Sequence, residues 1–325
     1  MKLESIKSTN NRGNTLKMDE QKPITFLELI QAIWEGKWLI CFSVVLFTSA
    51  AVVYALSSPN IYKASALLSP SESQSGSGLG GMANQLGGLA ALAGVDIGGG
   101  EGSQTALAVQ VLNSRKFVSN FITNRNILVP LMAANGWEMA SDTLKYDEEV
   151  YDPRKDQWLR KPKGLRKAKP SAQEAYEVFI NDVFSITQDK ENGSFTISVT
   201  HYSPFLARTW VNWLVDDINE VMRERKKFET QQNLAYLNNQ LNKTSVAEMQ
   251  GTFYELIKEQ TKSLMLTEVQ KDFVFKVVDP AVVPEMKYKP QRVLIALMGF
   301  VLGGIIGLLV VFLRFVIKQD KATQL

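Results

Sequence analysis

The residue types that usually carry catalysis or bind a metal are scarce in this sequence. His201 is the single histidine and Cys41 the single cysteine. A structural zinc site needs about four Cys or His ligands, and an internal disulfide needs two cysteines, so the sequence excludes both. No acidic residue stands beside His201, and we interpret it as structural. The sequence therefore predicts neither a cofactor nor a metal.

One short motif suggests nucleotide chemistry, but its context argues against it. Gly76, Gly78 and Gly81 match the Gly-x-Gly-x-x-Gly spacing of dinucleotide-binding proteins. They lie in a tract, residues 75–102, that is glycine-rich throughout and has no strand–helix–strand unit around it. We interpret the tract either as a loop or as an apolar surface that packs on a neighbour or the membrane. The apolar side chains of the second alternative are Leu86, Leu89, Leu92 and Val95.

A strongly basic stretch is the other candidate for binding chemistry. Residues 154–169 hold eight basic side chains and a single acidic one, Asp156. Prolines within and beside the stretch exclude a regular helix. A solvated loop is one interpretation, and contact with an acidic glycan or anionic lipid is the other. The candidate contact residues are Lys161, Lys163, Arg166 and Lys167.

The elements that must position these residues begin with two uncharged apolar segments. Residues 39–56 and residues 293–313 contain no charged side chain and are 18 and 21 residues long. About 20 apolar residues in a helix cross the hydrocarbon core of a bilayer. With Trp38 added to the first segment, we predict transmembrane helices at residues 38–56 and 293–313.

Charges beside these segments predict the orientation of the chain. Short flanks rich in lysine and arginine stay on the cytoplasmic side, so we expect residues 1–37 and 314–325 in the cytoplasm and residues 57–292 outside it. A net charge of +3 from 36 basic and 33 acidic residues gives no sign of nucleic-acid binding. The basic residues of the flanks are Lys2, Lys7, Arg12, Lys17, Lys22, Lys37, Arg314, Lys318 and Lys321.

The fold class that we expect is an α+β membrane protein, with a small α/β base and a long helical hairpin outside the membrane. Residues 57–203 form the base, with strands at 61–68, 183–188 and 195–200 and helices capped by Ser103, Ser114 and Ser171. Residues 204–271 form the hairpin, whose second helix starts at a Ser245–Glu248 capping box.

The first helix of the hairpin carries an apolar stripe that a shorter return helix leaves partly uncovered, so we expect a closed homo-oligomer. The stripe consists of Ala207, Val211, Leu214, Ile218, Val221, Phe228, Ala235 and Leu241.

The chain then returns to the membrane through residues 272–292, which contain a strand at 273–278 and a proline-rich stalk. Pro280, Pro284 and Pro290 favour extended backbone over helix. Inside the second apolar segment, glycines at every fourth position permit close approach of another helix in the bilayer. These glycines are Gly299, Gly303 and Gly307.

This arrangement resembles the Wzz polysaccharide co-polymerases, the O-antigen chain length determinants of Gram-negative inner membranes. The most specific stretches are residues 85–94, 241–250, 259–269 and 273–285. The resemblance implies a non-catalytic, bell-shaped homo-oligomer in the periplasm. Such an oligomer works with a Wzy-type polymerase and sets the modal number of repeat units on a lipid-linked glycan.

Three other classes share part of this layout. A tyrosine-kinase co-polymerase would need a nucleotide-binding domain after the second span, where this sequence has 12 residues. An efflux adaptor would need a β-barrel and lipoyl-type repeats, which the sequence does not show. An inner-membrane subunit of a capsule or exopolysaccharide export complex remains as the alternative.

Overall fold

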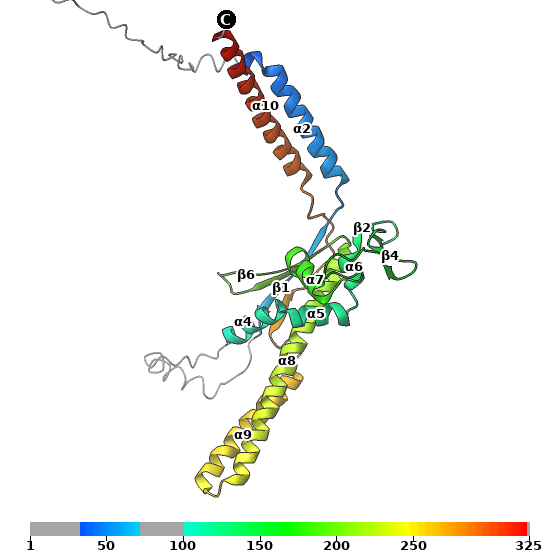
Figure 1. Cartoon of the computed structure of the whole chain (residues 1–325). Helices are drawn as coiled ribbons and strands as arrows, with labels where there is room; N and C mark the ends of the chain where they lie inside the picture. The colour runs from blue at the N-terminus through cyan, green and yellow to red at the C-terminus, as the bar shows by residue number, and fades with distance from the viewer. Residues whose placement is uncertain (1–32, 72–100, 324–325) are drawn as a thin grey trace, which may run out of the picture. The chain divides into compact units, whose positions relative to one another are not determined.

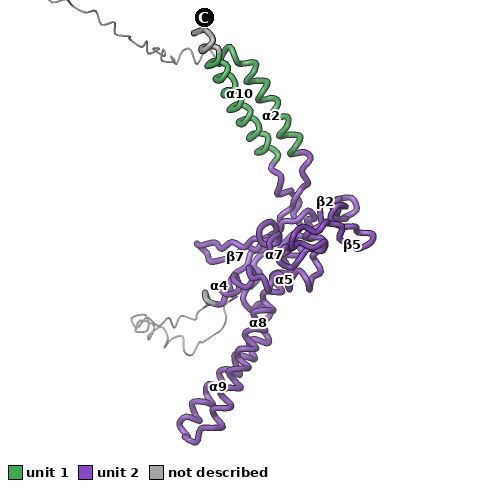
Figure 2. Tube along the Cα trace, in the orientation of Figure 1, with its two compact units in different colours: residues 1–55, 292–325 green, residues 56–291 purple. Residues whose placement is uncertain are grey.

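The computed structural model describes residues 33–71 and 101–323 of the chain. It divides into two compact units, which Figure 2 shows in different colours. Unit 1 combines residues 1–55 with residues 292–325, and unit 2 consists of residues 56–291. Most of the glycine-rich tract and most of the amino-terminal basic flank lie outside the described residues, and so do the glycines of the Gly-x-Gly-x-x-Gly motif.

Unit 1 contains two long apolar helices. Helix α2 (Lys37–Ser57) corresponds to the first predicted span, and α10 (Arg292–Thr323) continues well past the expected end at residue 313. Both are long and apolar enough to cross a membrane. Only 6% of the apolar window of α2 and 17% of that of α10 is buried, whereas the core helix of a soluble protein is mostly buried.

Unit 2 is built around a four-stranded antiparallel sheet. Its strands are β1 (Tyr62–Pro70), β6 (Phe184–Gln188), β7 (Phe195–His201) and β8 (Phe275–Asp279), in the order β6-β7-β1-β8. The four strands predicted from the sequence are confirmed to within one or two residues at each end. Along β1, Tyr62, Ala64, Ala66 and Leu68 are buried and alternate with more exposed residues, as a strand with one face on the core requires.

Helix α8 (Pro204–Lys243) packs against β1 and β7, and α9 (Ala247–Val269) returns along it (Figure 1). Ser203 caps α8 by accepting a hydrogen bond from the Leu206 N–H, and Pro204 fits the first turn. The predicted break before α9 is confirmed. The predicted Ser245–Glu248 capping box is wrong, because α9 starts after Val246 with no side-chain cap.

Shorter helices cover the remaining core. They are α4 (Glu101–Leu112), α5 (Arg115–Asn124), α6 (Leu128–Met132) and α7 (Ala172–Val178), with a π-helical turn η1 (Phe179–Val183) after α7. The Ser114 cap and the Ser171–Glu174 capping box are confirmed. Ser103 is not a cap, because α4 already starts at Glu101.

Two small hairpins were not predicted. Strands β2 (Ala134–Glu138) and β3 (Thr143–Tyr146) form one, and β4 (Tyr151–Asp152) and β5 (Gln157–Trp158) form the other. Their strands are too short to show a clear period in the sequence. Trp137 of β2 contacts the rings of Tyr62, at 5.8 Å, and Phe205, at 6.1 Å. The first hairpin therefore packs where β1 and α8 begin.

The core lies between the sheet, the first half of α8 and the short helices. Packing fully buries large side chains from each of these elements, and each such side chain contributes about 1.5–3 kcal/mol relative to full exposure. They include Leu68, Phe121, Phe179, Ile197, Trp210, Leu214 and Phe275.

Candidate functional site

The four candidate contact residues of the basic stretch lie on and beside a tight turn. The N–H of Lys163 donates to the Arg166 carbonyl at 3.0 Å, and the N–H of Arg166 donates to the Lys163 carbonyl at 3.1 Å. Gly164 occupies the first corner with φ +61°, a left-handed conformation that glycine adopts without strain. We refer to residues 161–167 as the basic turn. Lys161, Lys163, Arg166 and Lys167 are all exposed.

Arg160 fixes the basic turn to the start of α7. Its guanidinium binds both carboxylate oxygens of Glu174, at 2.7 and 3.3 Å, and donates to the Lys167 carbonyl at 2.7 Å. The hydrogen bond from Arg160 is the main cause that lowers the pKa of Glu174. Glu174 also closes the capping box of α7 with Ser171. Arg160 therefore has a positioning role, which the count of basic residues in the sequence did not separate from the others.

The other cations of the basic turn have few partners in the described part of the chain. Arg166 reaches Glu174 at 4.0 Å with its side chain 66% exposed. No carboxylate of the described residues lies within ion-pairing distance of Lys161, Lys163 or Lys167. The basic turn thus exposes its cations, and the side chains of those three lysines form no ion pair within the described residues.

In unit 1, the three glycines of α10 face α2. A Cβ placed on Gly299 would lie 2.5 Å from the Cβ of Ala51. One on Gly303 would lie 2.8 Å from the Cα of Val44, and one on Gly307 would lie 3.0 Å from the Cα of Ile40. A larger residue at these positions would force the two helices apart.

A polar contact accompanies the glycine contacts. The Ser43 hydroxyl donates to the Gly303 carbonyl at 2.9 Å, and the bond is buried. Gly304 points elsewhere, because the nearest atom to its added Cβ is a Val44 methyl carbon at 4.0 Å. The glycine face of α10 therefore consists of one glycine on each of three successive turns, and Gly304 is not part of it.

Residues 280–291, which contain Pro280, Pro284 and Pro290, form neither helix nor strand. Near their end they pair with the residue before β1. The N–H of Ile61 donates to the Lys289 carbonyl at 2.9 Å, and the N–H of Tyr288 donates to the Ile61 carbonyl at 2.8 Å. The chain therefore enters and leaves unit 2 at the same end.

His201 lies in the core of unit 2 and has no nucleophilic or acidic partner among its recorded contacts. Its Nδ1 accepts a hydrogen bond from the Ser203 N–H at 3.1 Å, so the proton belongs on Nε2, which donates to the Pro130 carbonyl at 3.1 Å. Burial is the main cause that lowers the pKa of His201. The ring lies 4.8 Å from that of Trp210. This arrangement holds a neutral imidazole and fits the structural role predicted for it.

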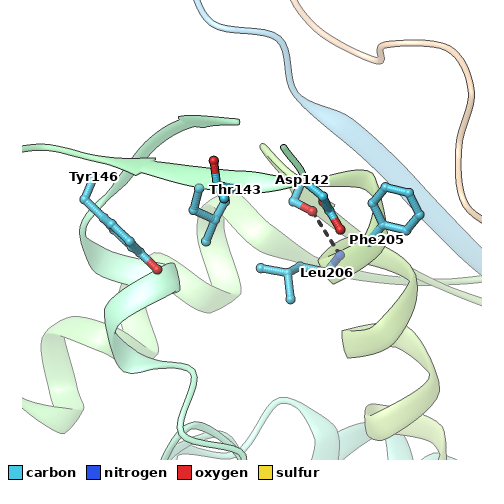
Figure 3. Close-up of a pocket in the computed structure, with 7 residues that line it drawn as sticks. Asp142, Thr143, Tyr146, Phe205 and Leu206 are labelled. Atoms are coloured by element: carbon cyan, nitrogen blue, oxygen red, sulfur yellow. Dashed lines mark hydrogen bonds between the residues drawn. The ribbon is translucent and has the colours of Figure 1, made fainter. Parts of the chain in front are cut away.

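A hollow of about 480 Å³ lies between β3 and the first turn of α8. Figure 3 shows Thr143 and Tyr146 on one side and Phe205 and Leu206 on the other. The carboxylate at its rim, Asp142, accepts a hydrogen bond from Trp137 Nε1 at 2.8 Å. Within the described residues, no three His, Cys, Asp or Glu side chains gather as metal ligands.

A larger groove of about 900 Å³ runs between α5 and α8. Its wall includes Phe117, Asn120 and Val221, together with the Arg125–Asp217 ion pair. The Arg125 guanidinium also lies over the ring of Trp213, with 5.1 Å between the guanidinium carbon and the ring centroid. The ion pair connects the end of α5 to the middle of α8, which is a structural task.

Comparison with known proteins gives two family matches along the chain. Residues 22–125 match the chain length determinant protein family, Wzz. Residues 230–316 match GNVR, described as a G-rich domain on putative tyrosine kinase. The search of curated proteins gave no match.

Two solved structures are similar over much of the chain. A full-length bacterial polysaccharide co-polymerase shares 12% identity at a TM-score of 0.40, over 91% of this chain and 99% of that one. A fragment of WzzB, a polysaccharide co-polymerase from Salmonella Typhimurium, shares 11% identity at a TM-score of 0.31, over 71% of this chain and 100% of that one. The chain thus combines a Wzz chain length determinant domain with a GNVR domain.

Proposed function

We propose that this protein sets the modal number of O-antigen repeat units in lipopolysaccharide, acting with a Wzy-type polymerase on a lipid-linked glycan. Co-polymerases of the Wzz family regulate chain length and are not catalysts. The observation that carries the proposal is the Wzz match over residues 22–125 in a chain with an apolar helix near each end. In this proposal, regulation depends on shape and on contact between the protein, the polymerase and the glycan.

The proposal places α2 and α10 in the bacterial inner membrane, with both termini in the cytoplasm and unit 2 in the periplasm. The exposed apolar surfaces of both helices support this placement, since water would be a poor solvent for them. The glycine face of α10 against α2 and the buried Ser43–Gly303 bond support it further, because close packing and hydrogen bonds hold helices together in lipid.

The proposal also includes a closed homo-oligomer. The first half of the predicted stripe on α8, from Ala207 to Ile218, is buried in unit 2. Its continuation is not, because Val221 is 42% exposed and Phe228 is 62% exposed. Tyr236, about two helical turns after Phe228 on α8, is 62% exposed as well. A second copy of the chain would cover this face and bury its apolar area.

A deletion strain tests the proposed function directly. Lipopolysaccharide from the strain, resolved on a gel, should lose its preferred length and show a broad distribution of short chains. The gene supplied in trans should restore the preferred length. An unchanged length distribution in the deletion strain would rule out the O-antigen role.

The GNVR match favours one alternative, the capsule or exopolysaccharide export complex, because that domain is named for its occurrence on putative tyrosine kinases. The same strain separates the two. Loss of surface capsule with normal lipopolysaccharide supports the export role, and loss of lipopolysaccharide length control with normal capsule supports the O-antigen role.

A further inference from the structure

The basic turn carries an apolar side chain at its tip that the fold does not use. Leu165 is 102% exposed, more than any other large hydrophobic side chain in the described part of the chain. It occupies the second corner of the turn, after Gly164, where hairpins usually carry small or polar residues. A leucine at this corner contributes nothing to the packing of unit 2.

Cations surround Leu165 on both sides. Lys163 and Arg166 close the turn through their backbones, and Lys161 and Lys167 come just before and after it. Arg160 holds the base of the turn through Glu174, so the tip projects from a fixed support. The result is an apolar side chain presented among four exposed positive charges.

The end of unit 2 that joins α2 and α10 is defined by covalent connection. Ile61 pairs with Lys289, and Tyr62 follows the last residue of α2, Ser57, by five residues. Five extended residues span at most about 17 Å. Lys289 precedes the first residue of α10, Arg292, by three residues.

A chain of ring contacts leads from this end to the basic turn. Trp137 of β2 contacts Tyr62 at 5.8 Å. At the other end of that hairpin, Tyr146 contacts Tyr151 at 5.7 Å, and Tyr151 contacts Trp158 at 5.1 Å. Figure 1 shows β2 and β4 on the same flank of unit 2, toward the start of β1. The basic turn follows Trp158 after two residues.

We propose that the basic turn contacts the surface of the membrane that α2 and α10 span, with Leu165 in the headgroup layer and the four cations on anionic phosphates. The proposal rests on the membrane placement given above. An interface of this kind takes both chemical features of the turn, because apolar side chains enter the boundary between headgroups and acyl chains while lysine and arginine stay at the phosphates. An acidic glycan would use the cations and leave Leu165 in water.

The test uses the full-length chain in lipid nanodiscs, with Cys41→Ala to remove the native thiol. Leu165→Cys carries an environment-sensitive fluorophore, and Lys258→Cys on α9 carries the same label as a reference, since Lys258 is 78% exposed. The discs contain either zwitterionic lipid alone or zwitterionic lipid with phosphatidylglycerol. Lipid with a spin label near its headgroup should quench the label at 165 severalfold more than that at 258, and more strongly when phosphatidylglycerol is present.

A charge-matched pair of variants tests the role of the basic turn. Lys163→Gln with Lys167→Gln should reduce the quenching at 165, by about fivefold in membrane partition for each charge removed. Arg154→Gln with Lys155→Gln removes the same charge from the neighbouring β4–β5 turn and should leave the quenching unchanged. Equal effects of the two pairs would overturn the proposal.

Three further results would also overturn it. The label at 165 could be as open to aqueous iodide as the label at 258, in both kinds of disc. It could be shielded only when a soluble acidic polysaccharide is added, which assigns the turn to the glycan. It could be shielded equally in detergent, which assigns the turn to a second copy. Lipid quenching at 165 together with a normal lipopolysaccharide length distribution in the deletion strain would reject the proposed function and keep this contact.

Discussion

The side-chain amide of Asn219 on α8 binds the backbone of Phe275 on β8 in both directions. Its Oδ1 accepts the Phe275 N–H at 2.9 Å, and its Nδ2 donates to the Phe275 carbonyl at 2.9 Å. The same oxygen accepts the Val274 N–H at 2.9 Å. Asn219 is 5% exposed. One buried amide thus fixes the edge strand that leads into the proline-rich residues 280–291.

Asn219→Ala should destabilise unit 2 by about 2–4 kcal/mol, because it leaves buried backbone groups of β8 without partners. Chemical denaturation of the full-length protein in detergent measures the change. Asn238→Ala on the same helix is the control, since the Asn238 amide makes an exposed bond to the Leu234 carbonyl, and its effect should stay within about 0.5 kcal/mol. Equal losses in the two variants would contradict the role assigned to Asn219.

His201 predicts a fall in stability at mildly acidic pH. The pKa of His201 is lowered in the folded state, chiefly by burial, and a proton on Nδ1 would break the bond from Ser203. The unfolded chain takes up this proton near its ordinary pKa of about 6.5. The stability that the neutral ring contributes is therefore complete above that pH and is lost as the pH falls toward the lower pKa of the folded state.

Thermal unfolding followed by tryptophan fluorescence, from about pH 8 to pH 5, checks this expectation. The Tm of the unaltered protein should decrease below about pH 6.5. His201→Gln should have a lower Tm at pH 8 and a flatter profile across the same range. A steep profile that survives in His201→Gln would assign the acid sensitivity to other groups.

The glycine face of α10 predicts a sharp difference between neighbouring glycines. Gly303→Leu should weaken the packing of α2 on α10, because even a Cβ at Gly303 would lie 2.8 Å from the Cα of Val44. Gly304→Leu should be tolerated, because a Cβ at Gly304 has only one methyl carbon, at 4.0 Å, within reach. Thermal stability in nanodiscs and oligomer size by native mass spectrometry measure both variants. A Gly303→Leu protein as stable and as large as the Gly304→Leu protein would rule out the packing role.

We expect different outcomes for substitutions of the adjacent basic residues Arg160 and Lys161. Arg160→Gln should release the basic turn, since it removes the hydrogen bonds to Glu174 and to the Lys167 carbonyl, with a cost of about 1–3 kcal/mol. Lys161→Gln should cost almost nothing, because exposed charges contribute little to stability. Proteinase K should cleave residues 159–170 faster in the first variant only. Identical digestion of both proteins would argue against an anchoring role for Arg160.

The basic flanks predict the membrane topology. Reporter fusions after Lys318 should be active only as cytoplasmic reporters. Fusions at Asn192, in the β6–β7 turn, should be active only as periplasmic reporters. Lysine and arginine in short flanks retain those flanks in the cytoplasm, which is the physical reason for the expectation. A periplasmic carboxyl terminus would exclude the two-span arrangement.

Local patterns in the sequence were enough to predict most elements of unit 2. Alternation identified β1, a turn signal at Asn192 marked the hairpin of β6 and β7, and the Ser171–Glu174 capping box marked the start of α7. Such features depend on a few adjacent residues, so they can be read without knowing the fold. The Ser245–Glu248 capping box was wrong because it is equally local. A four-residue pattern does not determine whether the backbone adopts the capping conformation at that position.

The apolar stripe of α8 shows that a local sequence pattern does not predict which residues are buried. All of its residues look equivalent in the sequence, yet Ile218 is fully buried and Phe228 is 62% exposed. The difference arises because only the first half of α8 packs against the sheet. The side chains that α8 uses to hold the core, Trp210 and Asn219, could not be recognised before their partners on distant strands were known.

The sequence by itself determined that the chain has two uncharged apolar segments, a glycine repeat in the second and a cluster of cations around residues 160–167. Those properties are composition and spacing, and they need no tertiary contact. Only the tertiary structure separated Arg160, which Glu174 binds, from the exposed lysines beside it, and only the tertiary structure left Leu165 uncovered at the tip of the turn. Whether a side chain is bound within the fold or left exposed depends on its contacts with residues far away in the chain, and only tertiary packing brings those residues together.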